Sequence, residues 1–491
     1  MLQGIVHGDE NPKGLDIITV DVKQRNGEPK EVIAIRDIDA RNMWNYDRTK
    51  GTFLPKTNRG MLQEFLVDHL MCNYAQANNA FLLDVENQVY GVGKESAFGA
   101  MNQFMLADGT PYTNMSYLFF DENSGNNIYR RVFESYVKAE NPDEVLPQEA
   151  FSEFLDAASR ISEMDDNEYL EMFEEVFSTI EDAETREKMK TVALARKQNL
   201  GTDSRQFVQR LQDLREAEHT PDVYKTADSI AFVNDVHGNA EALKAIFDEC
   251  RRTGKKDVYI LGDMIGFGPQ TNECLDLIRE QAQTGDLSIK CILGNHELYS
   301  LMGNKSFIGK SNGFEPENTS RVRKELTEEN RRFIESLPVT RKLEIGGKTV
   351  ELTHFPIKKD YTEDVHMYMG HGSGFSKSSV DMSGQEYIIY GHEHRTEATR
   401  GDAVGTIDTI DVEGTKFINL PSSGCVHGKK TSFVSLSLET KDGATVLAPT
   451  VETVEYDRMK LQEVLISTNN PKAHFFGLTQ DSLSGGEDVE K

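Results

Sequence analysis

Residues 229–293 alternate short apolar runs with amphipathic stretches, in an order that few folds can accommodate. The apolar runs predict strands, and the stretches between them have helical periodicity. Strands are expected at 229–234, 257–262 and 288–293, with helices at 240–252 and 271–283. Strands joined by crossover helices lie parallel in one sheet. This βαβαβ order therefore predicts a parallel sheet whose loops meet at its carboxyl edge.

Further strands are expected downstream, where short apolar runs alternate with turn residues. They are placed at 341–345, 349–353, 386–390, 406–411, 415–420, 432–438 and 444–456. Their pattern is typical of antiparallel strands, so we expect them to form or extend a second sheet. The last residues, 479–491, carry almost no apolar groups, which predicts a disordered acidic tail.

Five polar segments follow apolar runs in this half of the chain, which places each at the end of a strand. They are Asp235-Val-His237-Gly-Asn239, Gly262-Asp263, Gly294-Asn295-His296-Glu297, Thr353-His354 and Gly391-His392-Glu-His394. Loops at the carboxyl edge of a parallel sheet are neighbours, and ligands collect there. A carboxylate can bridge two cations, and imidazole and amide oxygen complete shells suited to Mn, Fe, Zn or Ni. Two such ions would hold the attacking and leaving oxygens of an in-line displacement.

Together the five segments resemble the motifs of the calcineurin-like metallophosphoesterases, over about 228–478. Residues 262–269 and 419–424 are similar to the small bacterial and archaeal phosphodiesterase branch. The resemblance implies an α/β fold, a two-sheet metallophosphoesterase sandwich flanked by helices, in a domain over 225–478. It also implies a hydrolase that cleaves phosphate esters, either phosphodiesters or small phosphorylated molecules, with a hydroxide activated by two metal ions.

The resemblance also implies a role for each polar residue. One metal ion would be held by Asp235, His237, Asp263 and His394. A second would be held by Asp263, Asn295, His354 and His392, so that Asp263 bridges the pair. Catalysis would rest on His296, Asn295 and Asp263, and His296 would protonate the leaving oxygen or stabilise its charge. Substrate contacts are expected from Asn239 and His296. Manganese is the expected metal, with Fe, Zn or Ni as alternatives.

Two other functions fit the same motifs. One is a phosphomonoesterase that acts on phosphoprotein, which needs an open cleft. The other is a regulatory binding protein with a vestigial esterase domain. The segments 303–325 and 357–384 interrupt the motifs and are either lids over the metals or solvated loops. Their basic residues are candidate substrate contacts: Lys310, Arg321, Arg323, Lys358 and Lys359.

Residues 1–224 have a mostly helical pattern, which predicts an α+β N-terminal domain. Helices are expected at 183–198 and 204–217 and on the apolar faces within 61–70, 151–161 and 170–180. Short strands are expected at 16–22, 31–36, 80–84 and 88–92. A faint resemblance to phosphatidylinositol-kinase-like loops lies at 79–98, but Gly93 stands where a metal-binding Asp is expected. The domain is thus either a degenerate kinase-like scaffold or an unrelated regulatory or partner-binding module.

The composition limits the partners of the protein. The 491 residues allow two domains or more, and 81 acidic against 54 basic residues give a net charge of −27. This charge repels long polyanions, so nucleic acid is disfavoured as the main partner. A phosphorylated small molecule or protein is the expected substrate, and the N-terminal domain is a candidate site for a protein partner.

The location expected from the sequence is cytoplasmic. No apolar stretch approaches the roughly 18 residues of a membrane helix, and the N-terminus shows no secretory signal pattern. Export without such a signal stays open. The five cysteines include no C-x-x-C pair, which favours a reducing compartment over a disulfide framework. They are Cys72, Cys250, Cys274, Cys291 and Cys425.

Overall fold

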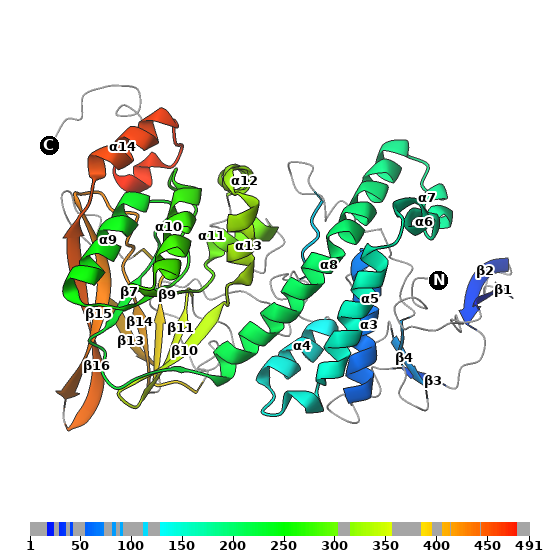
Figure 1. Cartoon of the computed structure of the whole chain (residues 1–491), viewed down its shortest axis with the longest axis horizontal. Coiled ribbons are helices and arrows are strands. Elements are labelled where there is room, and N and C mark those ends of the chain that lie inside the picture. Colours follow the sequence, from blue (N-terminus) through cyan, green and yellow to red (C-terminus); the bar gives the residue numbers. More distant parts are fainter. Residues whose placement is uncertain are drawn as a thin grey trace. The chain divides into compact units, whose positions relative to one another are not determined.

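The computed structural model divides the chain into two compact units (Figure 1). The first comprises Met1–Phe119 and Asn123–Arg215, and the second comprises Phe120–Glu122 and Glu216–Lys491. The structure describes residues 17–23, 29–35, 40–42, 55–72, 81–84, 89–91, 111–115, 128–302, 315–355, 384–394, 405–412, 414–441 and 443–478. The predicted tail at 479–491 lies outside the described residues.

The first unit is built mainly from helices. They are α3 Pro55–Leu70, α4 Ile128–Lys138, α5 Gln148–Ser162, α6 Asp166–Glu171, α7 Glu174–Ser178 and α8 Ala183–His219, with a 3-10 turn η5 at Pro142–Glu144. Two small antiparallel sheets pair β1 Ile17–Lys23 with β2 Pro29–Ile35, and β4 Phe81–Asp84 with β3 Ala40–Asn42 and β5 Val89–Gly91. This confirms the mostly helical α+β pattern expected from the sequence.

An aromatic core holds the helices of the first unit together. The ring of Phe65 on α3 lies 5.2 Å from that of Phe133 on α4 and 5.1 Å from that of Phe207 on α8. Arg196 of α8 is fully buried beside this core. Its guanidinium donates hydrogen bonds to the carbonyls of Tyr112 and His69. These hydrogen bonds offset the free-energy cost of burying the charge.

Two helix predictions in this unit were wrong. The helices expected at 183–198 and 204–217 form the single helix α8. One interior glycine, Gly201, weakens a helix by about 1 kcal/mol relative to alanine but does not end it. Conversely, the helical face at 170–180 is divided between α6 and α7, because the backbone at Phe173 leaves the helical region with φ −114° and ψ 3°.

The second unit contains two sheets. One has the strand order β16-β15-β7-β8-β9, and the other has the order β13-β14-β12-β11-β10-β6. The strands are β6 Asp222–Tyr224, β7 Ile230–Val233, β8 Asp257–Ile260, β9 Ser288–Cys291, β10 Thr340–Ile345, β11 Lys348–Thr353, β12 Tyr387–Tyr390, β13 Asp408–Val412, β14 Thr415–Asn419, β15 Lys430–Lys441 and β16 Ala444–Glu455. Two sheets were expected from the sequence, but β15 and β16, which were expected in the second sheet, belong to the first, and β6 was not expected.

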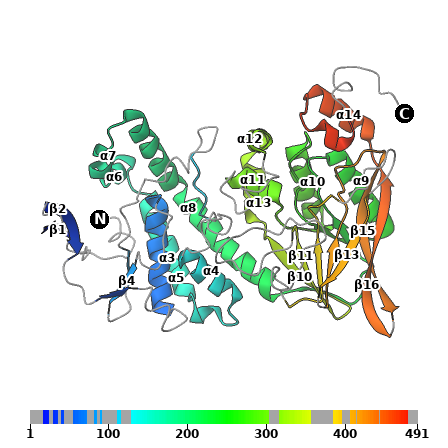
Figure 2. The ribbon, with the colours of Figure 1, turned by 180° about the vertical axis from the view of Figure 1, so that it is seen from behind.

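Strand direction agrees with the sequence in one sheet and departs from it in the other. The predicted parallel pairing of β7, β8 and β9 is confirmed. The later strands are not all antiparallel, because β12 runs parallel to both β11 and β14. Parallel neighbours need a long connection, which the segments before and after β12 provide. The β15–β16 hairpin joins the first sheet, where β15 pairs antiparallel with β7 (Figure 2).

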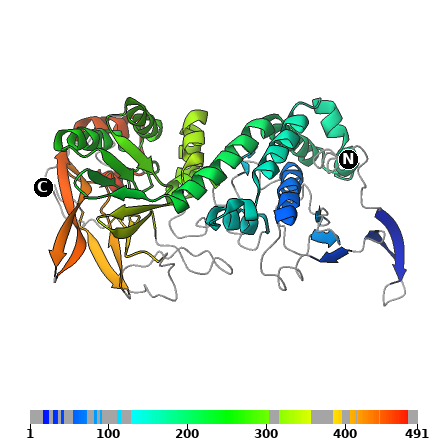
Figure 3. The ribbon, with the colours of Figure 1, turned by 60° about the horizontal axis from the view of Figure 1, so that its bottom comes forward.

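One apolar core joins the two sheets face to face. Phe232 and Tyr259 from the five-stranded sheet belong to the same buried cluster as Leu343, Ile389 and Ile418 from the six-stranded sheet. Two helices cover the other face of the five-stranded sheet (Figure 3). They are α9 Ala240–Thr253 and α10 Thr271–Thr284. The α/β sandwich flanked by helices is therefore confirmed.

Four further helices of the second unit were not predicted from the sequence. They are α11 Asn295–Met302, α12 Pro316–Glu325, α13 Glu328–Ser336 and α14 Arg458–Ser467, followed by a 3-10 turn η7 at Ala473–Phe476. α12 occupies the second half of the expected lid at 303–325, and Pro316 stands in its first turn, where proline favours a helix start. Within the described residues, no helix has the length and apolar character needed to span a membrane.

We predict that residues 216–478 fold without the first unit and that β6 stabilises them. Asp222 Oδ2 accepts a hydrogen bond from the hydroxyl of Tyr259 at 2.8 Å, and Tyr224 packs against the inter-sheet core. The segment 225–478 lacks both residues. Losing a buried hydrogen-bond partner costs about 1–3 kcal/mol, so this segment should unfold at a lower temperature than 216–478. Thermal unfolding followed by circular dichroism compares them, and equal midpoints would contradict the prediction.

Candidate metal centre

The polar residues singled out by the sequence meet at the carboxyl ends of strands from both sheets. The five-stranded sheet contributes Asp235 and His237 after β7, Asp263 after β8 and Asn295 after β9. The six-stranded sheet contributes His354 after β11 and the pair His392 and His394 after β12. Neither sheet alone supplies the whole set, so the site depends on the sheets being packed together.

The backbone at these positions is unusual. In the described part of the chain, seven non-glycine residues have a positive φ, and five of them are predicted ligands with φ between 43° and 70°. They are Asp235, His237, Asp263, His392 and His394. This conformation costs a non-glycine residue about 1–3 kcal/mol and persists only where the surroundings enforce it. It produces a sharp turn at each strand end, and such outliers cluster at functional sites.

A first group joins Asp235, His237, Asp263 and His394, whose ligand atoms all lie within 4.8 Å of one another. His237 Nε2 is 2.8 Å from His394 Nε2 and 3.6 Å from Asp263 Oδ2. Asp235 Oδ1 is 3.5 Å from His394 Nε2, is buried, and accepts no hydrogen bond. A buried carboxylate oxygen without a donor is unfavourable unless positive charge is near it, so the group fits a divalent cation.

A second group joins Asp263, His354 and His392. Asn295 Oδ1 lies between the two imidazoles, 3.0 Å from His354 Nε2 and 2.7 Å from His392 Nδ1. Asp263 Oδ2 is 3.3 Å from His354 Nε2, so one carboxylate oxygen faces both groups. His354 Nδ1 donates to the carbonyl of Leu261 at 2.6 Å, which leaves its Nε2 lone pair directed to the group.

The donor set suits transition metals. Two carboxylates, four imidazoles and one amide oxygen are ligands that Mn, Fe, Zn and Ni accept. The structure therefore brings together all seven side chains predicted from the sequence, in two groups that share Asp263.

Asn234 supports the first ligand loop. Its side-chain amide donates to Asp235 Oδ2 and, at 3.3 Å, to the carbonyl of Leu420. Asp235 Oδ2 also accepts the backbone N–H of His392 at 3.0 Å. A Cβ on Gly391 would lie 1.8 Å from Asn234 Oδ1, so the asparagine and this glycine fit together. Asn234 thus has a packing partner in the last ligand segment.

Glu297 organises the loop that carries Asp263. Its Oε2 accepts the backbone N–H groups of Asp263 at 2.9 Å and Gly294 at 2.8 Å, and its Oε1 accepts that of Ile265 at 3.1 Å. Burial and the neighbouring Asp263 carboxylate raise the pKa of Glu297 to about 7. The sequence marked this residue only as part of a motif, and the structure shows that it orients the central carboxylate through the backbone.

The electrostatics of the centre favour a bound positive charge. Burial acts to raise the pKa of Asp263, but the imidazoles around it, above all His354, hold it well below its usual value. Burial acts to lower the pKa of His354, but Asp263 and Asp235 raise it to about 9. Burial, followed by the nearby His354, lowers the pKa of His392 to about 4. Metal binding to such histidines displaces protons.

His296 lies beside the two groups but belongs to neither. Its backbone N–H donates to Asp263 Oδ1 at 2.8 Å, and its ring stands edge-on to that of His237 at 4.8 Å. Burial lowers the pKa of His296. Its ring is therefore available to interact with a molecule bound at the two groups.

The loop after β8 is held by contacts that the sequence did not reveal. Phe267 stacks on the ring of His237 at 4.4 Å and contacts His296 at 4.6 Å. Arg321 Nη2 donates to the carbonyls of Gly266 at 2.6 Å and Gly268 at 3.2 Å, on either side of Phe267. Arg321 was a candidate substrate contact in a lid, but it lies on α12 and fixes this loop. Lys310, Lys358 and Lys359 lie outside the described residues.

Asn239 has a supporting role in the structure. It caps α9, where its Oδ1 accepts the N–H of Ala242 at 3.0 Å, and its Nδ2 donates to the carbonyl of Gly424 at 2.9 Å. Its side chain is fully buried. Because both polar atoms are used within the protein, this geometry favours positioning of the first ligand loop over direct contact with substrate.

A family model described as calcineurin-like phosphoesterase matches residues 229–396. This stretch contains all seven predicted ligands. Residues 229–396 belong to the calcineurin-like phosphoesterase family. The resemblance drawn from the five motifs is thereby confirmed for the part of the second unit that carries the centre, which is called the phosphoesterase domain below.

The curated relatives are matched over part of their length. An uncharacterized protein of Methanocaldococcus jannaschii is 33% identical over 148 residues, 28% of this chain and 58% of the relative. A zinc-dependent endopolyphosphatase of Saccharomyces cerevisiae is 33% identical over 94 residues, 19% of this chain and 27% of the relative. A symmetrical bis(5'-nucleosyl)-tetraphosphatase of Paracidovorax citrulli is 39% identical over 70 residues, 14% of this chain and 24% of the relative. The chain thus spans between a quarter and little more than half of these proteins.

A solved structure of a hypothetical protein from Pyrococcus horikoshii is also similar to this chain. It is 17% identical, covers 52% of this chain and 96% of its own length, and has a TM-score of 0.37.

We predict that Glu297→Gln destabilises the domain. An amide offers one acceptor oxygen, so at least one of the three backbone N–H groups would face an NH2 donor. Leaving a buried donor unsatisfied costs about 1–3 kcal/mol. Urea unfolding in the presence of a chelator measures this change without a contribution from metal. Glu280→Gln, an exposed change on α10, is the matched control. Equal stability of both variants would show that Glu297 does not hold the loop.

Proposed function

We propose that the phosphoesterase domain hydrolyses phosphate esters with two divalent metal ions. The observation that carries this proposal is the position of Asp263. Its Oδ2 lies 3.6 Å from His237 Nε2 and 3.3 Å from His354 Nε2, so a single carboxylate oxygen faces both groups of ligand atoms. A shared carboxylate is what two neighbouring cations require.

The two groups define which residues would hold each ion. The first ion would be held by Asp235, His237, Asp263 and His394. The second would be held by Asp263, Asn295, His354 and His392. When bound, two such ions neutralise the charge of a phosphate and lower the pKa of water. The protein's own contribution is to fix the ligands, because both acids and all the imidazoles are held by buried neighbours before any substrate arrives.

His296 is proposed as the residue that interacts with the leaving oxygen. Its ring stands beside His237 and belongs to neither ligand group, and its backbone is tied to Asp263. It is therefore close to the reacting phosphate without being occupied by a metal. From this position an imidazole N–H can donate a proton, or a hydrogen bond, to the oxygen that departs.

The proposed substrate is a phosphodiester or a small phosphorylated molecule. Two relatives of the domain are named as hydrolases of polyphosphate and of a bis-nucleosyl tetraphosphate; both names refer to phosphorylated compounds that are not proteins, and the second is a small molecule. A panel of nitrophenyl phosphate, a nitrophenyl phosphodiester, polyphosphate, a dinucleoside tetraphosphate and a phosphopeptide, with added Mn, tests this. Turnover confined to the phosphopeptide would favour a protein phosphatase. No turnover by metal-loaded protein would favour a vestigial domain.

Manganese is the proposed metal, and zinc is its main competitor. The set of imidazole and carboxylate ligands accepts both ions, and the yeast relative is named as zinc-dependent.

A cytoplasmic location is proposed because all five cysteines are free and buried, as expected in a reducing compartment. For the first unit, we retain the proposal of a regulatory or partner-binding role.

We predict that Asp263→Ala and His296→Ala fail in different ways. Asp263 faces both groups, so its loss should remove metal as well as activity. His296 is outside both groups, so its loss should spare the metal content and lower kcat by about 10²–10⁴-fold, the usual contribution of a positioned proton donor. The loss should be smaller for a nitrophenyl ester than for an alkyl ester, because an acidic leaving group needs less protonation.

The two measurements are metal content by elemental analysis and kcat for both esters. His427→Ala, which removes an exposed histidine of the same unit, is the control and should change neither. If His296→Ala loses its metal, or if both esters slow by the same factor, the role assigned to His296 is wrong.

A further inference from the structure

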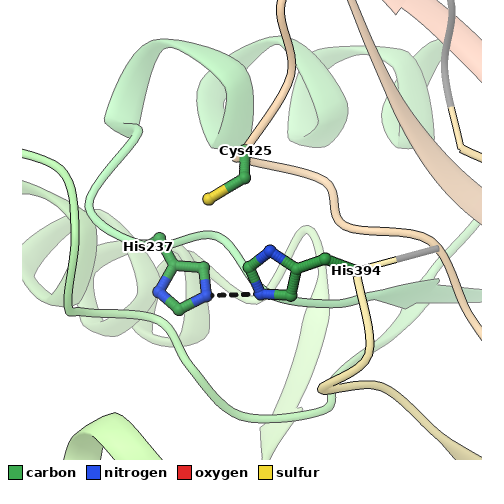
Figure 4. Close-up of side chains that lie close together, drawn as sticks. All are labelled: His237, His394 and Cys425. Carbon is green, nitrogen blue, oxygen red and sulfur yellow. Dashed lines mark hydrogen bonds between the residues drawn. The ribbon is translucent and has the colours of Figure 1, made fainter. Parts of the chain in front are cut away.

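The thiol of Cys425 lies beside the two histidines of the first ligand group. The ligand atoms of Cys425, His237 and His394 are all within 4.8 Å of one another. Figure 4 shows the sulfur near both rings, to one side of the line that joins their Nε2 atoms. The thiol is 5% exposed. No motif in the sequence pointed to this residue, and it is not among the expected ligands.

The two ring nitrogens of His394 face different neighbours. Nε2 is 2.8 Å from His237 Nε2 and 3.5 Å from Asp235 Oδ1, so it faces the first group. The sulfur of Cys425 lies within 4.8 Å of a ring nitrogen of His394. Figure 4 shows the second ring nitrogen, Nδ1, on the edge of the ring that faces the sulfur. The thiol therefore lies beside a different edge of the ring from Nε2.

The position of a cation in this group is marked independently of the cysteine. Asp235 is 0% exposed, and its Oδ1 accepts no hydrogen bond while facing His394 Nε2 at 3.5 Å. The carboxylates of Asp235 and Asp263 form one group with the two histidines, and Cys425 forms another with the same two histidines. The thiol therefore lies next to both histidines that would hold the first ion.

The loop that carries Cys425 is fixed to the backbone of the first ligand segment. Asp235 O accepts hydrogen bonds from Ser422 Oγ at 2.9 Å and from the N–H of Gly424 at 3.0 Å. The N–H of Cys425 donates to Ser422 Oγ at 2.9 Å. A Cβ on Gly424 would lie 1.8 Å from Val236 O, so these two segments are in direct contact. The backbone of the Cys425 loop is therefore coupled to that of Asp235.

We propose that Cys425 is a positioning residue of the metal centre. Its sulfur accepts the Nδ1–H of His394, which fixes the ring orientation and keeps the Nε2 lone pair directed toward the first ion. This inference rests on the proposed function, because it requires that ion. Partners that orient a metal-binding histidine through its second nitrogen typically change metal affinity by 10–100-fold. In such partners the acceptor is usually oxygen, so a thiol in this role differs from the usual arrangement.

The test compares Cys425→Ala with Cys425→Ser in the full-length, metal-stripped protein. Alanine removes the acceptor, whereas serine retains one. Titration with Co²⁺, followed by its visible absorption and by competition with a chelator, reports the affinity and geometry of each site. We expect alanine to weaken one of the two sites by about 10–100-fold and to alter its spectrum, and we expect serine to restore most of the affinity. Cys274→Ala, a buried thiol on α10, is the control and should match the wild type.

Four outcomes would overturn the proposal. The first is that Cys425→Ala binds two ions as the wild type does. The second is a sulfur-to-cobalt charge-transfer band in the wild type that both variants lose, which would make Cys425 a ligand. The third is an equal loss in Cys274→Ala, which would indicate a general packing effect. In these three cases the proposed function still stands. The fourth is a wild type that binds no Co²⁺, Mn²⁺ or Zn²⁺, which would remove the proposed function as well.

Discussion

The structure of the phosphoesterase domain depends on the burial of opposite charges around Asp263. An isolated carboxylate is costly to bury, and so is an imidazolium. Here they are buried together, and each shifts the pKa of the other, with that of Asp263 well below its usual value and that of His354 at about 9. Protons on the histidines balance the acids when no cation is bound. A divalent ion would supply the same positive charge, so the arrangement suits metal binding as well as burial of the acids.

This cluster requires a rigid frame, because five of its residues have a left-handed backbone. Strain of about 1–3 kcal/mol at each such residue must be offset elsewhere. The parallel strands β7, β8 and β9 supply part of this frame by fixing the starts of three loops. Glu297 supplies another part, because it binds three backbone N–H groups around Asp263. Asn239 holds the loop after β7 and Arg321 holds the loop after β8. Each donates a hydrogen bond to a backbone carbonyl distant in sequence.

The sequence predicted the elements that local pattern controls. Strand ends, the βαβαβ order and the candidate ligand residues could be read from the sequence because apolar runs are followed directly by polar motifs. Strand direction could not be identified in the later strands, since β12, which is parallel to its neighbours, and β15, which is antiparallel to its neighbours, both contain a continuous buried run. Two helices were expected at 183–198 and 204–217, where α8 is continuous. Cys425 was not singled out and Arg321 was assigned a different role, because their positions beside His394 and Gly266 depend on residues far away along the chain.

The division of the ligands between two sheets has a further consequence. Asp235, His237, Asp263 and Asn295 come from one sheet, and His354, His392 and His394 come from the other. Anything that binds both sets links the sheets, and a ligand that binds only the folded state stabilises it. The inter-sheet core and the metal centre should therefore support each other. The loop between β14 and β15 passes from one sheet to the other and carries Cys425, so the thiol contacts His394 at the junction where the two sheets must keep their register.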